Sequence, residues 1–437
     1  MDELNELGYT PGEDRLFRKN GMKYLLLFSL LYASVYCMRL NIGNATGLMI
    51  AEGIINEKQA GILSGLLFWF YGVGQLVSGR ISETKSPVTL LTVSVALSAG
   101  MNLLFGLQNN FVLMAIIWAV NGFAQSLAWS PGVVALSKWF PGSRRGFSLG
   151  FALAFSGFGQ ALSYIAVAAA FAAFPGLGWR AAFLIPLILP VILLVVFRLF
   201  AKNKPEDVGL RSYKEPDPEK SLLETEIKKK VDEGGVFTPF LLVLKTKGFL
   251  LWIPFSFLGG LVRYGLCTWV PLYFNQVYGI DPTSGLLQSA ILPVGMGFGT
   301  FIVPWFTDRF CPNNRLPAAV ISAIVAAVSI GVLLGLDPTV PSQLAVIELL
   351  LFVTGFAVYA VSGISWAVAT DVGGRALSGT ASGILNFSSY IGAAVQSVIY
   401  GFLLSRIGWR MVFISMIAAC VINSLIALIK SLKGKRK

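Results

Sequence analysis

Long apolar stretches recur along the whole chain and are separated by short polar segments. Twelve of them reach the roughly twenty residues that an α-helix needs to cross a lipid bilayer. They lie near residues 24–50, 60–81, 87–107, 111–137, 146–173, 179–200, 248–275, 284–306, 317–336, 342–370, 377–404 and 408–429. A transmembrane β-barrel would show short segments of alternating polarity instead. The pattern therefore predicts an all-α membrane protein with twelve transmembrane helices.

One polar stretch is much longer than the other loops. Residues 202–235 are dense in charge and proline and follow the sixth apolar stretch. We interpret them as a linker, which predicts one domain at 1–201, the linker at 202–236 and a second domain at 237–437. Motifs recur in both halves at nearly one offset: GWRAAF (178–183) with GWRMVF (408–413), GFA (122–124) with GFA (355–357), and Arg39 with Arg263. Two pseudo-symmetric six-helix bundles are expected, with any substrate site between them.

The composition agrees with a membrane protein and not with one that binds nucleic acid. The chain is 55% hydrophobic and 13% charged, about half the charged share of a soluble domain. Its net charge is +12, and most of the basic residues lie at one end of the predicted helices. Of its 34 Lys and Arg residues, those at the other end are Lys58, Arg180, Arg406 and Arg410, and those within helices are Arg39 and Arg263. By the positive-inside rule both termini are expected in the cytoplasm, with the helices in the plasma membrane.

The residues do not assemble a catalytic centre. The chain has no histidine, so the usual proton shuttle and the commonest metal ligand are missing. Its four cysteines have neither the spacing of a zinc site nor that of a disulfide framework. We therefore expect a protein that is not an enzyme and holds no cofactor or metal. Glu348 is an acid near the start of stretch 342–370, where a structural use is favoured over proton transfer.

Two arginines lie inside apolar stretches. A charged side chain at the centre of a membrane helix costs about 2.5–3.5 kcal/mol, and no acidic residue lies within one helical turn of Arg39 or Arg263. A guanidinium group offers paired, permanently protonated donors that match phosphate or carboxylate oxygens. We therefore predict that the two arginines form an anion-binding site.

Aromatic and amide side chains supply further polar groups at this depth. Tyr32, Tyr36 and Arg39 have the i, i+4, i+7 spacing of one helical face. Buried tyrosine hydroxyl groups need hydrogen-bond partners. We expect these residues to line a cavity for a small hydroxylated anion together with side chains of other predicted helices: Tyr71, Gln75, Tyr359, Asn386 and Tyr390.

Three segments carry a resemblance to a known family. Arg39 matches an arginine of a first helix, RYGLCTWVP (263–271) matches a seventh-helix stretch, and NKPEDVGLR (203–211) matches the start of a linker. Over essentially its whole length the chain resembles the organophosphate:phosphate antiporters of the major facilitator superfamily. The resemblance implies the major facilitator fold and substrate-binding roles for Arg39, Arg263, Tyr32, Tyr36, Tyr71, Tyr359 and Tyr390. It also implies that Ser156 stands where the family has a histidine, and that Glu83 and Asp308 stand where the superfamily carries a gating acid.

The chain departs from the family at several charged positions. Neutral residues stand where the family has basic, acidic or tyrosine side chains: Leu40, Gln75, Ser156, Gly260, Thr268 and Pro293. The chain therefore keeps the two arginines of the family but has neutral residues at these positions. These departures leave the substrate and any pH dependence open.

Alternating access follows from the arrangement of the two arginines. One anion is expected to bridge them, which would draw the two halves together. An empty carrier would occlude two unpaired cations at a cost of up to about 5–7 kcal/mol, which suppresses its transition by up to four or five powers of ten. We therefore expect exchange of a small phosphorylated metabolite, such as glycerol-3-phosphate or a sugar phosphate, for inorganic phosphate, by a monomer.

Three alternatives stay open. A sugar-acid or other carboxylate transporter of the same superfamily would also use buried arginines. A proton-coupled symporter would need a titrating group, for which Glu348 is the candidate. A transporter-like receptor would bind the phosphate ester without exchanging it.

Overall fold

The computed structural model describes residues 9–140, 142–211, 226–227, 229–231, 233–235, 237–246, 248–310 and 316–434. Every regular element in these ranges is a helix. The helices of the first half are α1 (Pro11–Val35), η1 (Tyr36–Met38), α2 (Asn41–Ala51), α3 (Glu57–Thr84), α4 (Pro87–Gly106), α5 (Phe111–Ser126), α6 (Trp129–Trp139), α7 (Gly142–Ala173), η2 (Pro175–Arg180), α8 (Ala181–Leu184) and α9 (Ile188–Phe200). After η3 (Pro205–Val208) come α11 (Thr238–Lys245), α12 (Trp252–Tyr278), α13 (Pro282–Ser289), α14 (Ile291–Phe310), α15 (Leu316–Leu333), α16 (Pro341–Arg406) and α17 (Trp409–Gly434).

Eleven spans in the described ranges are long and apolar enough to cross a membrane. The twelfth predicted span is α12, which has 27 residues but is rich in glycine, tyrosine and tryptophan. These residues lower its mean hydropathy, and most of its side chains are buried against protein and not exposed to lipid. With α12 included, the predicted all-α architecture of twelve membrane helices is confirmed.

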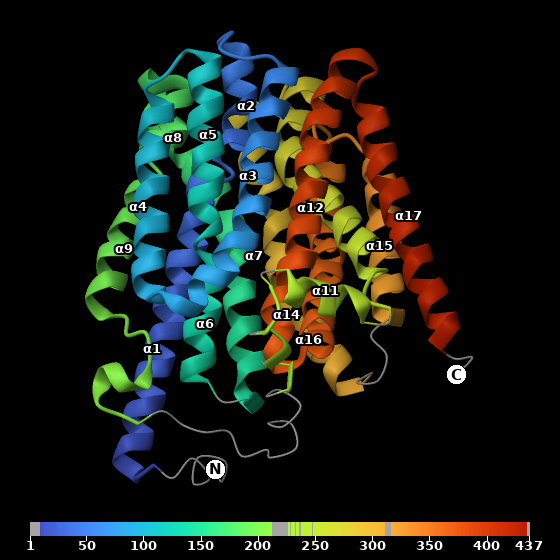
Figure 1. The fold of residues 1–437 in the computed structure, drawn as a ribbon. Coiled ribbons are helices and arrows are strands. Elements are labelled where there is room, and N and C mark those ends of the chain that lie inside the picture. Colours follow the sequence, from blue (N-terminus) through green and yellow to red (C-terminus); the bar gives the residue numbers. More distant parts are fainter. Residues whose placement is uncertain are drawn as a thin grey trace.

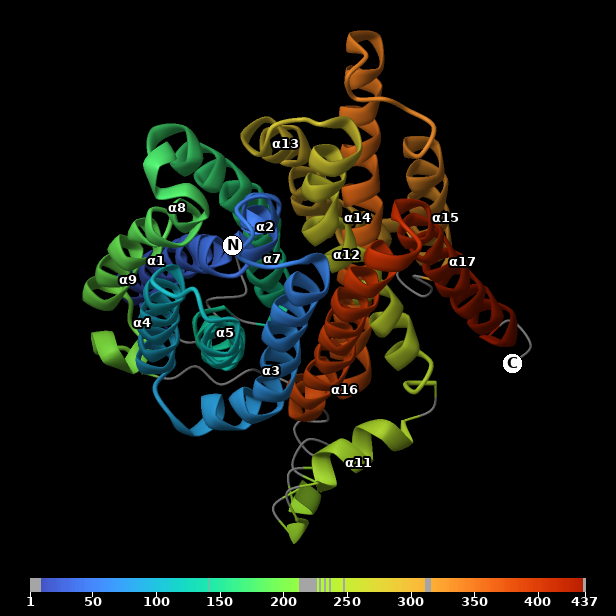
Figure 2. The same cartoon turned by 90° about the horizontal axis from the view of Figure 1, so that it is seen from above.

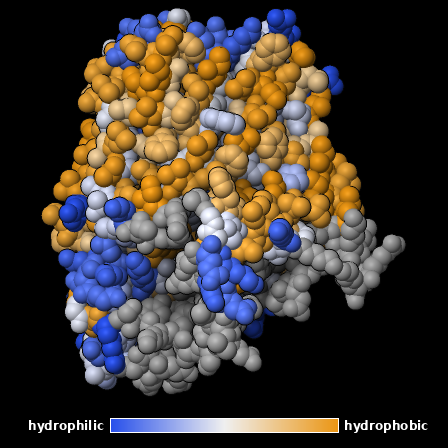
Figure 3. Space-filling model, viewed as in Figure 1, coloured by the Kyte–Doolittle hydropathy of each residue, from blue (hydrophilic) through white to orange (hydrophobic). Residues whose placement is uncertain are grey.

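The helices form two groups that lie side by side. Seen from above, α1–α9 gather on one side and α12–α17 on the other (Figure 2). The start of α1 and the end of α17 lie at the same end of the bundle (Figure 1). We call this the linker end, because α9 ends and α12 begins there. A hydrophobic belt surrounds the visible face, with hydrophilic residues at both ends (Figure 3).

The element α16 contains two of the membrane spans, Pro341–Ser365 and Thr380–Arg406. A straight helix of 66 residues would be about 100 Å long. Both spans nevertheless contribute residues to one pocket, so the element doubles back between them. Tyr359 and Tyr390 are thereby brought close together although they are far apart along the helix.

The two groups of helices contact each other closely at the end opposite the linker. The Gln276 side chain donates a hydrogen bond to Glu57 Oε1 (3.2 Å). Gly61 and Gly401 face each other across α3 and α16, and a Cβ at Gly61 would overlap the carbonyl oxygen of Ser397. The bundle is therefore held shut on that side by backbone-to-backbone packing, for which glycine is needed.

Four expected helices are interrupted. The stretch 111–137 is divided into α5 and α6 after Ser126, and the stretch 179–200 into α8 and α9 after Leu184. The stretch 24–50 was expected as one helix, but α1 ends at Val35 and is followed by the 3-10 turn Tyr36–Met38 before α2 begins. The stretch 284–306 is likewise divided into α13 and α14 at Ala290, three residues before Pro293. Proline cannot donate a helical hydrogen bond, whereas the break after Val35 has a tertiary cause that the site explains.

Candidate functional site

The break in the first span exposes one backbone carbonyl to three side-chain amides. Met38 O accepts hydrogen bonds from Asn102 Nδ2 (3.2 Å), Asn121 Nδ2 (3.0 Å) and Gln125 Nε2 (2.8 Å). These amides come from α4 and α5, so the turn is stabilised by the neighbouring helices. A carbonyl freed from helical bonding in lipid must be satisfied in this way. The arrangement holds the next residue, Arg39, in place.

Arg39 is 1% exposed and is held on several sides. Its Nε donates to Gln125 Oε1 (2.7 Å), and its Nη1 donates to the Tyr390 hydroxyl (3.2 Å). The guanidinium carbon lies 4.6 Å from the ring centre of Tyr36 and 4.5 Å from that of Tyr71. Nη2 has no hydrogen-bond partner among the described residues. All of these partners are neutral, so the positive charge of Arg39 is solvated by dipoles and rings without being cancelled.

Arg263 is less constrained. It is 7% exposed, and its Nε and Nη2 both lack hydrogen-bond partners within the described ranges. The guanidinium carbon lies 3.9 Å from the ring centre of Tyr359 and 4.5 Å from that of Tyr264. A buried donor without a partner is costly, which indicates that a ligand or water satisfies these groups. Arg263 therefore has two free donors within the described structure, whereas Arg39 already uses Nε and Nη1 in hydrogen bonds.

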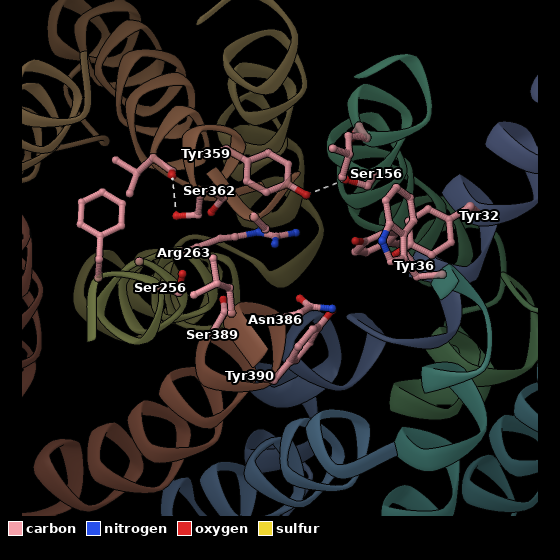
Figure 4. A pocket seen from close by; sticks show the side chains of 18 residues that line it. Tyr32, Tyr36, Ser156, Ser256, Arg263, Tyr359, Ser362, Asn386, Ser389 and Tyr390 are labelled. Carbon is pink, nitrogen blue, oxygen red and sulfur yellow. Dashed lines mark hydrogen bonds between the residues drawn. The ribbon is translucent and has the colours of Figure 1, made fainter. Parts of the chain in front are cut away.

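A pocket lies between the two groups of helices beside Arg263 (Figure 4). Its cavity has a volume of about 40 Å³, which accommodates a few water molecules. The first half of the chain contributes Tyr32, Tyr36, Trp129, Leu153 and Ser156. The second half contributes Arg263, Tyr359 and Tyr390 together with a group of small polar residues: Ser256, Ser362, Ser365, Asn386 and Ser389. None of the described residues that line it is Asp, Glu, Lys or His.

Hydroxyl groups link the two halves across this pocket. The Ser156 and Tyr359 hydroxyl groups are 2.6 Å apart and share a hydrogen bond. The Tyr390 hydroxyl accepts from Arg39 and also from the Tyr264 hydroxyl (3.0 Å). Tyr71 stacks on Tyr390, with ring centres 4.1 Å apart. The arginine of the first half is therefore in contact with α16 of the second half.

Most residues expected at the site are brought together. Those lining the pocket are Tyr32, Tyr36, Ser156, Arg263, Tyr359, Asn386 and Tyr390. Arg39 and Tyr71 lie directly behind Tyr36 and Tyr390 and do not line it. Gln75 is turned away, because its Nε2 donates to Ser126 O (2.9 Å) and its Oε1 accepts from Ser130 (3.4 Å). Its role at the substrate stays a prediction.

The two expected gating acids occupy helix ends. Glu83 lies in the last turn of α3, and Asp308 lies near the end of α14. Their side chains fall outside the described part of the structure. Glu348, the candidate for a titrating acid, is exposed on α16 and is not among the residues that line the pocket.

Several site residues were not anticipated from the sequence. Gln125 is fully buried and contacts Arg39 directly. Tyr264 stacks on Arg263, and Ser256, Ser362 and Ser389 line the pocket. The only usable signal was spacing, because Ser256 stands seven residues before Arg263 and therefore on the same helical face.

Comparisons with known proteins agree with this architecture. Residues 28–397 match the Major Facilitator Superfamily. The chain is 27% identical to the glycerol-3-phosphate transporter of Bacillus subtilis over 93% of this chain and 91% of that protein. It is 25% identical to a probable hexose phosphate transport protein of Chlamydia trachomatis, over 90% and 86%. A bacterial homologue of the human lysosomal transporter Spinster, solved inward-facing and unoccupied, superposes with a TM-score of 0.73 at 16% identity, over 94% and 96%.

Proposed function

Because this chain belongs to the Major Facilitator Superfamily, we propose that it is a secondary transporter of a small phosphorylated metabolite. The metabolite, glycerol-3-phosphate or a sugar phosphate, crosses the membrane in exchange for inorganic phosphate by alternating access. Relatives that transport glycerol-3-phosphate and hexose phosphate support the substrate class.

The observation that carries this proposal is a pair of buried guanidinium groups with no carboxylate partner among the described residues. Arg39 belongs to the first half of the chain and Arg263 to the second. A phosphate monoester carries about −1.5 to −2 charges near neutral pH, which balances two arginines. Its oxygens can also accept from the N–H donors left open in the described structure, which are Nε and Nη2 of Arg263 and Nη2 of Arg39.

The packing of the two halves supports an arrangement open toward the linker end. Gly61 and Gly401 seal the opposite end, whereas the pocket is lined by Phe255 and Ser256 near the start of α12. An anion arriving from the linker end would meet the free donors of Arg263 first. It would then reach Nη2 of Arg39 and compete with Tyr390 for Nη1.

Exchange follows from the charge of the empty site. A loaded carrier closes around a neutralised pair, while an empty one encloses two unpaired cations in a low-dielectric interior. The cavity of about 40 Å³ must also widen to admit an ester, so binding and rearrangement are coupled. Glu348, the candidate for proton coupling, is exposed and is not among the described residues that line the pocket, which favours exchange without proton coupling.

The remaining features of the proposal concern topology. We place both termini in the cytoplasm and the helices in the plasma membrane, since basic residues gather at the linker end. The domains are residues 1–201 and 237–437, joined by the linker 202–236. One chain contains residues of both halves around a single pocket, so a monomer suffices.

Counterflow in proteoliposomes tests the function. Vesicles loaded with phosphate are diluted into labelled phosphate, and glycerol-3-phosphate, glucose-6-phosphate and a hexuronate are added in turn as competitors. We expect phosphate self-exchange that the two phosphate esters inhibit and the hexuronate does not. Absence of phosphate self-exchange together with exchange in hexuronate-loaded vesicles would support a carboxylate transporter, and binding of an ester without exchange would support a receptor.

A further inference from the structure

We propose that Ser256, Ser362 and Ser389 form a hydroxyl-recognising subsite that restricts the substrate to phosphate monoesters of neutral, polyhydroxylated compounds. The inference rests on the proposed function, because it concerns the part of the ester beyond the phosphate. It excludes two other classes of phosphate ester: those with a carboxylate group and those with a plain alkyl group.

The first part of the subsite lies on α12. Ser256 and Arg263 are seven residues apart and share one face of the helix. Gly259 and Gly260 lie between them and carry no side chain that would fill the space. A Cβ at Gly260 would overlap the carbonyl oxygen and Oγ of Ser389. The missing side chain therefore places Ser389 of α16 within one turn of Arg263.

The second part lies on the two spans of α16. Ser362 follows Tyr359, whose ring covers Arg263, by one helical turn. Ser389 and Asn386 are one turn apart on the other span, and both line the pocket. Figure 4 shows Ser256, Ser362 and Ser389 on the side of Arg263, facing Tyr32 and Tyr36 across the cavity. A ligand between these walls meets hydroxyl groups on one side and aromatic rings on the other.

The hydroxyl group of Ser256 indicates that the pocket binds a polar ligand. Its side chain is 6% exposed, and its Oγ has no hydrogen-bond partner among the described residues. Serine commonly satisfies a buried hydroxyl by bonding the carbonyl oxygen three or four residues earlier, as Ser365 does with Val361 O (3.2 Å). Ser256 makes no such bond, so its donor and acceptor remain available in the pocket. A ligand hydroxyl can use both.

The charge of the pocket disfavours a ligand with a second anionic group. Among the described residues that line the pocket, Arg263 is the only one with a formal charge, and Arg39 lies behind Tyr36 and Tyr390. A phosphate already balances these two cations. A carboxylate at the other end of the ester would be desolvated among serine hydroxyls and rings without a cation, which is unfavourable.

The size of the effect follows from hydrogen-bond energetics. One hydrogen bond between neutral groups changes affinity by about two- to tenfold. Losing two or three of them is therefore expected to weaken an alkyl phosphate by at least about fourfold against glycerol-3-phosphate. We expect a comparable or larger loss for 3-phosphoglycerate, because its carboxylate lacks a partner.

The test measures selectivity in phosphate-loaded proteoliposomes. Glycerol-3-phosphate, ethyl phosphate and 3-phosphoglycerate compete with labelled phosphate, and the ratio of each inhibition constant to the KM for phosphate is recorded. We expect glycerol-3-phosphate to inhibit at concentrations at least about fourfold lower than either of the others. Ser256→Ala and Ser389→Ala should raise its ratio about two- to tenfold each while the ratio for ethyl phosphate stays constant. Ser329→Ala, at a buried serine of α15 outside the pocket, serves as the matched control.

Two outcomes would overturn the inference. One is inhibition by 3-phosphoglycerate or ethyl phosphate at the concentrations that suffice for glycerol-3-phosphate. The other is a pair of serine variants whose ratios match those of Ser329→Ala. Failure of the proposed function looks different, since phosphate self-exchange itself would then be missing in the unaltered protein.

Discussion

Replacing Gln125 with Glu should abolish the anion site by neutralising Arg39, and it also removes the hydrogen bond that Gln125 donates to Met38 O. Gln125 Oε1 accepts from Arg39 Nε at 2.7 Å, and its Nε2 donates to Met38 O at 2.8 Å and to Ser98 Oγ at 2.9 Å. These bonds fix which way the amide faces. An amide satisfies the arginine and leaves its charge available, whereas a carboxylate in the same place would cancel it.

The magnitude follows from Coulomb's law. Two unit charges about 4 Å apart interact by about 4 kcal/mol at an effective dielectric constant of 20. A carboxylate at Gln125 would remove an attraction of that order between Arg39 and a bound phosphate. We therefore expect the affinity for phosphate to fall by up to about three powers of ten.

Two further variants separate charge from packing. Gln125→Met keeps the size and the neutrality of the side chain but loses its hydrogen bonds, so we expect about a tenfold rise in the KM for phosphate. Gln396→Glu places a carboxylate at another fully buried glutamine, whose partners are Trp269 and Ser397 and which contacts no arginine in the described structure. All three proteins are purified, checked for monodispersity and thermal stability, and assayed for phosphate self-exchange.

The reasoning would be refuted if Gln125→Glu exchanged phosphate with an unchanged KM. It would also fail if the Glu and Met variants were equally impaired, because Gln125 would then matter for packing alone. A stable Gln396→Glu protein with a normal KM completes the comparison, since it shows that a buried carboxylate elsewhere is tolerated.

Three more predictions follow from the same geometry. Arg39→Lys and Arg263→Lys should each lower the kcat/KM of exchange by about tenfold to a hundredfold, because an ammonium group cannot supply the paired donors; near-normal exchange in both would argue against direct coordination. Gly61→Leu should slow exchange by preventing closure against Ser397 while phosphate binding, measured by calorimetry, persists. Velocity at saturating phosphate should change less than twofold between pH 7 and 8, since the chain has no histidine and no acid is among the described residues that line the pocket; a change steeper than the titration of phosphate itself explains would reveal a titrating group of the protein.

The hydrophobic pattern was enough to predict the fold because a membrane helix must satisfy its backbone internally and face lipid with apolar side chains. That signal is weakest where a helix faces other helices. In α12 the glycines and aromatic residues that serve packing and the pocket replace the apolar residues that would mark a span. The apolar pattern still marked residues 248–275 as a span, and the motifs repeated between the halves supported that assignment.

The site could be predicted only where it carries charge. Arg39 and Arg263 were conspicuous because burying a charge in a membrane is costly. Gln125 and the pocket serines are neutral and cost little, so nothing in the sequence distinguished them from packing residues. The break at Tyr36–Met38 was also hidden, because the amides that bind Met38 O lie 64 to 87 residues away in the chain.

The reliance of α12 on other helices has a consequence for how the protein is made. This span leaves the ribosome before α16 and α17, the helices that cover much of its surface. Until they arrive, a moderately polar segment with an arginine must wait in the insertion machinery or beside the completed first half. Substitutions on the α16 face that receives Gly260, such as Ser389→Leu, would then reduce the yield of inserted protein more than the stability of the copies that mature.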